Sequence, residues 1–240
     1  MNGRAVQTRR LPEPSRARGS ARAAALAAGL VLAGACRQGH GELEVFAASS
    51  LRDACLELGP LFEGEHPGLH LVFDFGASNA LAEQLIASTH GGVFLSADEL
   101  EIDRIELTGR MLEGARREFL ANSLVVVVPA GAAPERVPHR PEELGSAVFE
   151  RISLAHPEAV PAGRYAREWL TNLRLWNDVE HKVVPALDGR AALTAVAAGG
   201  ADAGIGYATD AAITPGVRVA FPVEGPAAPA GRYHAAAVKP

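Results

Sequence analysis

The stretch Leu43–Glu63, LEVFAASSLRDACLELGPLFE, joins an expected strand to an expected helix. Residues 43–47 form a short, mostly apolar run of the kind found in buried strands. Apolar residues then recur at the i, i+3, i+4, i+7 and i+11 positions of one helix face: Leu51, Ala54, Cys55, Leu58 and Phe62. Two serines, Ser49 and Ser50, stand between the strand and the helix.

The same alternation of short apolar runs and helical patterns continues to the end of the chain. Further strands are expected at 69–75, 93–95, 122–128, 151–155, 203–207, 217–221 and 235–238. Further helices are expected at 79–88, 100–107, 164–173 and 190–198. Strands that alternate with helices predict an α/β fold with largely parallel sheets.

Composition and charge exclude several classes of protein. The chain has 240 residues, of which 48% are hydrophobic and 21% charged, as in an ordinary globular protein. Residues 1–35 hold six of the 23 basic residues and one of the 28 acidic residues, so the remainder carries 17 basic and 27 acidic residues, a net charge of −10. A chain this acidic is not expected to bind nucleic acid, because phosphate backbones attract basic surfaces.

The first 35 residues have the pattern of a secretory signal. An arginine-rich region precedes the apolar run Ala23–Ala35, which is too short to span a bilayer as a helix. The segment Leu32–Cys36, LAGAC, resembles a bacterial lipobox, so Cys36 is a candidate for lipidation; the alternative is a plain signal cleaved near Ala35. Both alternatives place the mature protein in the periplasm or elsewhere outside the cytoplasm, in the first case as a membrane-anchored lipoprotein.

Hydroxyl, glycine and other small residues gather at five places where an expected strand or loop meets the next element. These segments are Ala48–Ser50, Gly76–Asn79, Val160–Tyr165, Asp188–Arg190 and Tyr207–Asp210. In open α/β sheets, ligands bind beyond the carboxyl ends of the strands. Helix starts offer unpaired N–H groups, and the helix dipole favours negative charge there. One such segment alone is usually a simple helix cap, but five together predict an anion site made of neutral donors.

Six stretches in the same order resemble the periplasmic molybdate/tungstate-binding proteins of ABC transporters. They are Val45–Leu51, Phe75–Ser78, Val93–Asp98, Asn122–Val127, Val160–Ala166 and Gly204–Tyr207. The resemblance implies a two-lobed α/β fold of the periplasmic-binding-protein type, with the oxyanion in a cleft between the lobes. It places lobe 1 at 41–120 plus 222–240 and lobe 2 at 121–221.

The resemblance also implies which residues bind the anion. Ser50 and Ser78 would donate through their hydroxyl and backbone N–H groups, Ala162 and Gly189 through backbone N–H groups, and Tyr207 through its hydroxyl. These five residues form the expected molybdate site, with no side chain that ligates a metal, no catalytic residue and no cofactor beyond the molybdate or tungstate ligand. The expected partners are the oxyanion and an ABC transporter permease, with a lipid anchor if Cys36 is modified, and the protein is expected to be a monomer.

One departure from the family concerns the end of the chain. Family members usually continue past the last strand into a C-terminal helix, which is not expected here because the sequence stops at Pro240. We therefore expect apolar surface to be exposed on lobe 1.

Two other functions are compatible with the sequence. The first is a binding protein for another oxyanion, such as sulfate, or for a small carboxylate. The second is a secreted hydrolase with Ser50 or Ser78 as nucleophile, which would need a nearby His and an orienting acid. No local motif supports the hydrolase, and we expect the protein not to be an enzyme. A fully deprotonated dianion only accepts hydrogen bonds, whereas hydrogen phosphate also needs an acceptor for its proton, so a site made only of donors favours molybdate, tungstate or sulfate.

Overall fold

A computed structural model describes residues 41–240, which belong to one compact unit of the chain. The expected signal segment 1–35 and Cys36 lie outside the described residues. Within residues 41–240, none of the helices combines the length and the apolar character needed to cross a membrane.

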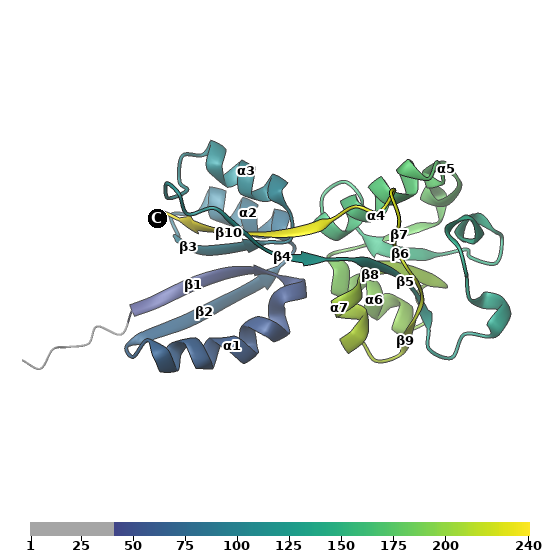
Figure 1. The fold of residues 1–240 in the computed structure, drawn as a ribbon, viewed down its shortest axis with the longest axis horizontal. Coiled ribbons are helices and arrows are strands. Elements are labelled where there is room, and N and C mark those ends of the chain that lie inside the picture. Colours follow the sequence, from purple (N-terminus) through teal and green to yellow (C-terminus); the bar gives the residue numbers. More distant parts are fainter. Residues whose placement is uncertain (1–40) are drawn as a thin grey trace, which may run out of the picture. The chain divides into compact units, whose positions relative to one another are not determined.

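Strands and helices alternate along most of the described chain (Figure 1). The strands are β1 (Gly41–Ala48), β2 (Leu69–Gly76), β3 (Gly92–Ser96), β4 (Arg117–Asn122), β5 (Leu124–Pro129), β6 (Ile152–Ala155), β7 (Val183–Ala186), β8 (Ala203–Tyr207), β9 (Val217–Pro222) and β10 (Gly231–Val238). The α-helices are α1 (Arg52–Glu65), α2 (Ser78–Ala87), α3 (Glu99–Leu107), α4 (Pro161–Asn172), α5 (Trp176–Val179), α6 (Gly189–Ala197) and α7 (Ala208–Ile213). Four short 3₁₀ turns complete the described elements: Ser49–Leu51, Pro134–Arg136, Pro141–Gly145 and Glu180–Lys182.

The strands form two five-stranded sheets, which define the two lobes used below. Lobe 1 has the strand order β2-β1-β3-β10-β4, and lobe 2 has the order β7-β6-β8-β5-β9. In lobe 1, β1 pairs in parallel with β2 and β3, but β10 runs antiparallel to β3 and β4. In lobe 2, β6 is parallel to β7 and β8, but β5 runs antiparallel to β8 and β9. The expectation of largely parallel sheets is therefore wrong: both sheets are mixed, because a strand that enters from the other lobe inserts in the opposite direction.

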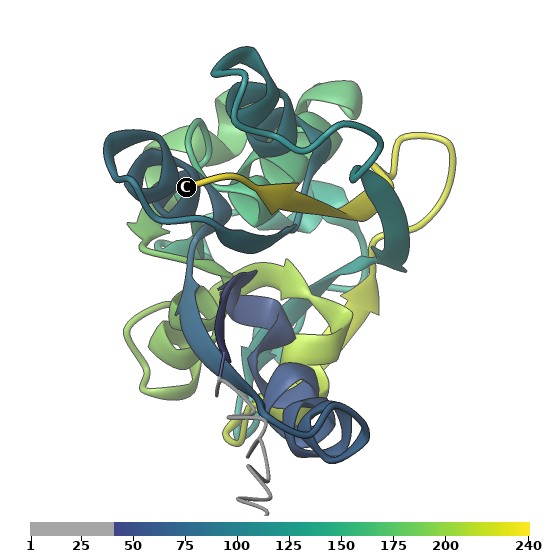
Figure 2. The ribbon, with the colours of Figure 1, turned by 90° about the vertical axis from the view of Figure 1, so that its left-hand side faces the viewer.

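Helices cover both faces of the lobe 1 sheet, as the alternation of its side chains requires (Figures 1 and 2). Phe46 and Phe94 pack with buried residues of α2 and α3, while the neighbouring Val45 and Ala47 face the opposite side, where Cys55 of α1 packs. Lobe 2 is built in the same way. Val125 and Val127 contact Leu193 of α6, whereas Val126 belongs to the cluster that contains α4.

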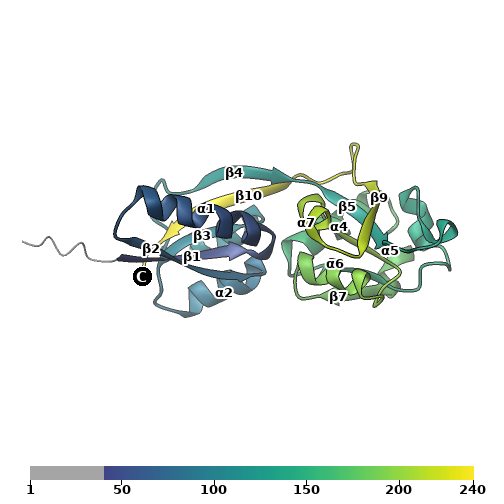
Figure 3. The same cartoon turned by 90° about the horizontal axis from the view of Figure 1, so that it is seen from below.

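The chain crosses between the lobes twice, and the two crossings lie next to each other (Figure 3). Ser123 joins β4 to β5, and residues 223–230 join β9 to β10. On the lobe 1 side β4 pairs with β10, and on the lobe 2 side β5 pairs with β9.

An apolar groove of about 260 Å³ lies between α1 and the sheet of lobe 1. Its lining is formed by Leu43, Val45, Cys55, Leu58, Gly59, Phe62, Leu71, Phe73, Val93 and Leu95. Leu58 is 61% exposed and Phe62 38% exposed. Apolar side chains are thus partly exposed along this groove of lobe 1.

Most expected elements are present, with small shifts of their ends. The shift at α4 matters most, because this helix begins at Pro161 rather than at residue 164 and so places Ala162 in its first turn. Proline is well suited to that first position, where its missing N–H costs no hydrogen bond. Two strands and two α-helices of the described chain were not expected from the sequence: β4, β7, α5 and α7.

Candidate functional site

All five predicted site residues line one small hollow to which both lobes contribute. Its lining is formed by Ala48, Ser49, Ser50, Gly76, Ala77, Ser78, Ala97, Val160, Pro161, Ala162, Asp188, Gly189 and Tyr207. The free volume is only about 10 Å³, close to the minimum that admits one water-sized group. A hollow of this size has no room for a sugar or a peptide.

Lobe 1 contributes two serine hydroxyls, each placed where a parallel strand ends. Ser50 follows β1, is half-buried, and its Oγ lies 2.7 Å from the hydroxyl of Tyr233 on β10. Ser78 follows β2 as the first residue of α2 and is 1% exposed. Its Oγ accepts a hydrogen bond of 3.0 Å from the backbone N–H of Ala97.

Lobe 2 contributes the first turns of two helices. Ala162 is the second residue of α4, and Gly189 is the first residue of α6. Both precede the point at which N–H groups find partners inside the helix. A methyl group on Gly189 would lie 3.5 Å from Cβ of Ala162, so the two helix starts are close neighbours. Together they direct the positive ends of two helix dipoles at one place.

Tyr207 ends β8 and is 3% exposed. Among residues 41–240, its hydroxyl finds no hydrogen-bond partner although it is buried. Burial raises the pKa of this hydroxyl well above its ordinary value of 10, so it keeps its proton at neutral pH and can donate it. A buried hydroxyl without a partner is costly, and a ligand that accepts its proton removes that cost.

One carboxylate also lines the hollow. Asp188 is the N-cap of α6, and its Oδ1 accepts a 2.9 Å hydrogen bond from the N–H of Ala191. Capping therefore occupies one oxygen of Asp188.

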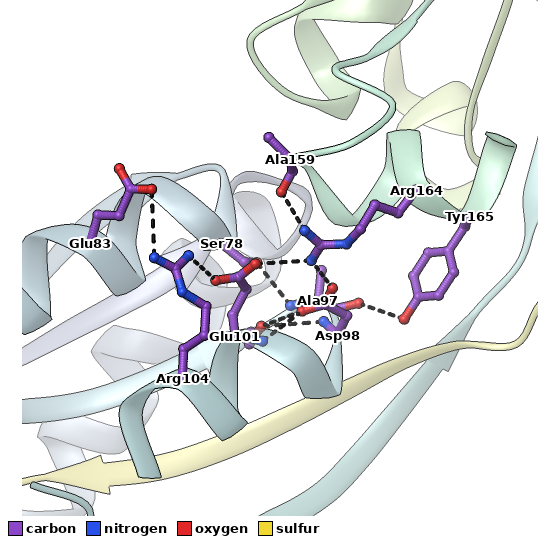
Figure 4. Close-up of polar contacts among 10 residues, drawn as sticks. Ser78, Glu83, Ala97, Asp98, Glu101, Arg104, Ala159, Arg164 and Tyr165 are labelled. Carbon is purple, nitrogen blue, oxygen red and sulfur yellow. Dashed lines mark hydrogen bonds and ion pairs between the residues drawn. The ribbon is translucent and has the colours of Figure 1, made fainter. Parts of the chain in front are cut away.

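An arginine soon follows each of the two helix starts, and each is bound to carboxylates outside the hollow. Arg164 of α4 pairs with Asp98 and, at 3.0 Å, with Glu101, both in or next to α3 of lobe 1 (Figure 4). Burial opposes the charge of Arg164, but these two carboxylates raise its pKa above the ordinary value. From the sequence, the acidic cluster around Asp98 is explained by the start of a helix. Asp98 does cap α3, accepting from the N–H of Glu101, and the ion pairs across the lobes are a second role that the sequence does not reveal.

Arg190 forms the second link between the lobes. Its Nε lies 2.9 Å from Oδ1 of Asp210 in lobe 2, and its Nη2 lies 2.5 Å from Oδ2 of Asp53 in lobe 1. Asp210 is fully buried, and its second oxygen has no partner among the described residues. Burial raises the pKa of Asp210 from 3.8 to about 6, against the opposing effect of Arg190.

The geometry gives the hydrolase interpretation no support. Within residues 41–240, Ser50 Oγ bonds to a tyrosine and Ser78 Oγ to a backbone N–H, and neither has a histidine partner. The same part of the chain contains no group of three His, Cys, Asp or Glu residues that could hold a metal ion.

Two lobes joined by adjacent crossings, with a small hollow lined by several donor groups and one carboxylate from both lobes, define a binding protein for a small solute. A family model described as bacterial extracellular solute-binding protein matches residues 43–239, so the chain belongs to that family.

Known proteins with similar sequence or fold agree with this assignment. The molybdate-binding protein ModA of Escherichia coli (strain K12) is 33% identical over 198 residues, which cover 82% of this chain and 77% of the relative. ModA of Haemophilus influenzae is 31% identical over 186 residues, covering 76% and 73%. The structure of the Azotobacter vinelandii periplasmic molybdate-binding protein matches with a TM-score of 0.69 and 24% identity, covering 82% of this chain and 85% of that one.

Sequence reasoning missed the contacts of four residues around the five predicted ones. Tyr233, Asn122, Arg164 and Arg190 act through contacts with distant parts of the chain; Tyr233 is 183 residues from Ser50. No local motif could have indicated such a pairing.

Proposed function

We propose that this protein binds molybdate or tungstate between its lobes, outside the cytoplasm, and delivers it to an ABC importer. Ser50, Ser78, Ala162, Gly189 and Tyr207 are the proposed ligand-binding residues. The two ModA relatives, which are named for molybdate binding, support this choice of ligand.

The buried hydroxyl of Tyr207 is the observation that carries the proposal. It can donate a proton, has no partner within the described residues, and lines the same hollow as two serine hydroxyls and two helix starts. A tetrahedral dianion without protons offers acceptors in several directions at once, which matches donors that converge from both lobes. Because lobe 1 and lobe 2 both contribute donors, the anion binds the closed arrangement better than an open one and shifts the population toward it.

Further parts of the proposal concern how the protein is used. Cys36 would carry a lipid that anchors the protein to the membrane, and the protein would work as a monomer with a permease as its partner. Labelling with a radioactive fatty acid in a bacterial host, with Cys36→Ser as control, tests the lipid anchor.

Calorimetric titration with molybdate, tungstate, sulfate and phosphate tests the choice of ligand. We expect heat and a raised melting temperature with molybdate and tungstate, because a ligand that binds only the native state stabilises it. Preference for sulfate over both would identify a sulfate-binding protein instead. Absence of any response to molybdate and tungstate would refute the proposal.

A further inference from the structure

A chain of hydrogen bonds leads from Asn122, at the crossing between the lobes, to the Ser50 hydroxyl in the hollow. Asn122 ends β4, and its side chain has an unambiguous orientation. Its Oδ1 accepts a 3.0 Å hydrogen bond from the backbone N–H of Ser123, which can only donate. The Nδ2 group, which also can only donate, lies 2.8 Å from Oγ1 of Thr209 and 3.3 Å from the hydroxyl of Tyr233.

Tyr233 is the next member of this chain of donors. Its hydroxyl accepts from Asn122, so its own proton is free to be donated, and Ser50 Oγ lies 2.7 Å away. Tyr233 is 1% exposed, so water has little access to it. Burial raises the pKa of Tyr233, which keeps the proton on its hydroxyl.

Ser50 is the last member of the chain. With Tyr233 as the donor, the Ser50 proton points away from the tyrosine and is available to a group in the hollow. The Ser78 proton is likewise left for a group in the hollow, since Ser78 Oγ accepts directly from the N–H of Ala97, which can only donate. Each serine thus has one lone pair occupied by a protein donor.

We propose that Tyr233, oriented by Asn122, makes Ser50 a dedicated donor and thereby selects anions that carry no proton over hydrogen phosphate. A serine hydroxyl with no fixed neighbours can rotate and either donate or accept, so it tolerates both kinds of anion. The hydrogen-bond chain removes that freedom before the ligand arrives. This inference rests on the proposed function, and Tyr233 acts in it as a positioning residue that does not itself line the hollow.

Tyr233→Phe is the primary test, because it removes the orienting hydroxyl and keeps the ring. Titrations are made at mildly alkaline pH, where phosphate is mainly a monohydrogen dianion with the same charge as molybdate, and phosphate is measured by its displacement of molybdate. We expect molybdate affinity to fall about tenfold and the preference for molybdate over phosphate to narrow by a similar factor. The preference between molybdate and tungstate stays unchanged, because neither carries a proton.

Asn122→Asp is the second variant and reverses the chain of donors. A carboxylate at this position can only accept from Tyr233, so Tyr233 accepts from Ser50 and the serine turns a lone pair toward the ligand. The preference for molybdate over phosphate should then narrow further than in Tyr233→Phe. The added charge acts equally on two dianions and does not explain a change in their ratio.

Tyr165→Phe is the matched control. Its hydroxyl donates to the carbonyl of Ala97 over 3.4 Å and touches neither serine, so its loss should leave the molybdate-to-phosphate ratio as in the wild type. A ratio that stays at the wild-type value in both Tyr233→Phe and Asn122→Asp, with wild-type molybdate binding intact, overturns the inference alone. A wild-type protein that binds neither molybdate nor tungstate overturns the proposed function as well.

Discussion

Replacing Tyr207 by Phe should change stability and affinity in opposite directions. The substitution removes one hydroxyl and leaves the ring in place. In the ligand-free protein that hydroxyl is buried without a partner among the described residues, which costs on the order of 1–3 kcal/mol. We therefore expect Tyr207→Phe to raise the free energy of unfolding by about 1 kcal/mol. With molybdate bound, the same hydroxyl makes a hydrogen bond to a charged group, and its loss should weaken binding by about 1.5–3 kcal/mol, or roughly ten- to 150-fold.

Urea unfolding without ligand and calorimetric titration with molybdate measure the two effects separately. Tyr165→Phe is the control, because it also removes a tyrosine hydroxyl but one that lies outside the hollow and bonds to the Ala97 carbonyl. A Tyr207→Phe protein that binds molybdate like the wild type would remove Tyr207 from the site. A lower stability of the ligand-free variant would refute the argument from the unpaired hydroxyl.

Three further predictions concern neighbouring groups. Ser78→Ala should lower molybdate affinity by about 1.5–3 kcal/mol, because the ligand loses a hydroxyl donor. It should also lower the free energy of unfolding by about 1–3 kcal/mol, because the buried N–H of Ala97 loses its acceptor. A variant that binds molybdate as tightly as the wild type in titrations would contradict this. Gly189→Ala should bind within about 0.5 kcal/mol of the wild type, since the new methyl has its nearest neighbour at 3.5 Å, whereas Gly189→Pro, which suits the first position of a helix but lacks the N–H, should bind about 1.5–3 kcal/mol more weakly. Equal affinities of these two variants would exclude the backbone donor. The pKa of Asp210 is raised by burial to about 6, so its contribution to stability is complete below pH 3.8 and is lost as the pH rises through about 6. Urea unfolding at several pH values should therefore show that the stability of the wild type relative to Asp210→Asn falls by at most about 3 kcal/mol over this range. A stability difference that does not change with pH would contradict the raised pKa.

The sequence predicts those parts of the fold whose residues carry a local signal. The valine-rich β5 and the amphipathic α4 are recognisable because burial on both faces or on one face leaves a pattern in the sequence. The strand β4, with sequence REFLAN, leaves no such pattern, because it lies at the edge of its sheet with mostly exposed side chains. The antiparallel direction of β5 and β10 depends on pairing between distant segments, which no local pattern records.

The residues of the site also differ in whether they carry a local signal in the sequence. The five proposed ligand-binding residues occur at strand ends and helix starts, where small and hydroxyl residues stand out in the sequence. The residues that orient or connect them do not stand out. An arginine such as Arg164 near a helix start is ordinary in a sequence, and only the folded chain brings it to Asp98 and Glu101.

The two adjacent crossings between the lobes limit how the lobes can move. Because β4 is bonded to β10 and β5 to β9, the linkers at Ser123 and at residues 223–230 lie side by side and act together as one hinge. Each ladder lies inside one lobe, so rotation of the lobes about the line through both linkers leaves the ladders intact. One distance between labels on the two lobes, followed as molybdate is added, would report rotation about these linkers.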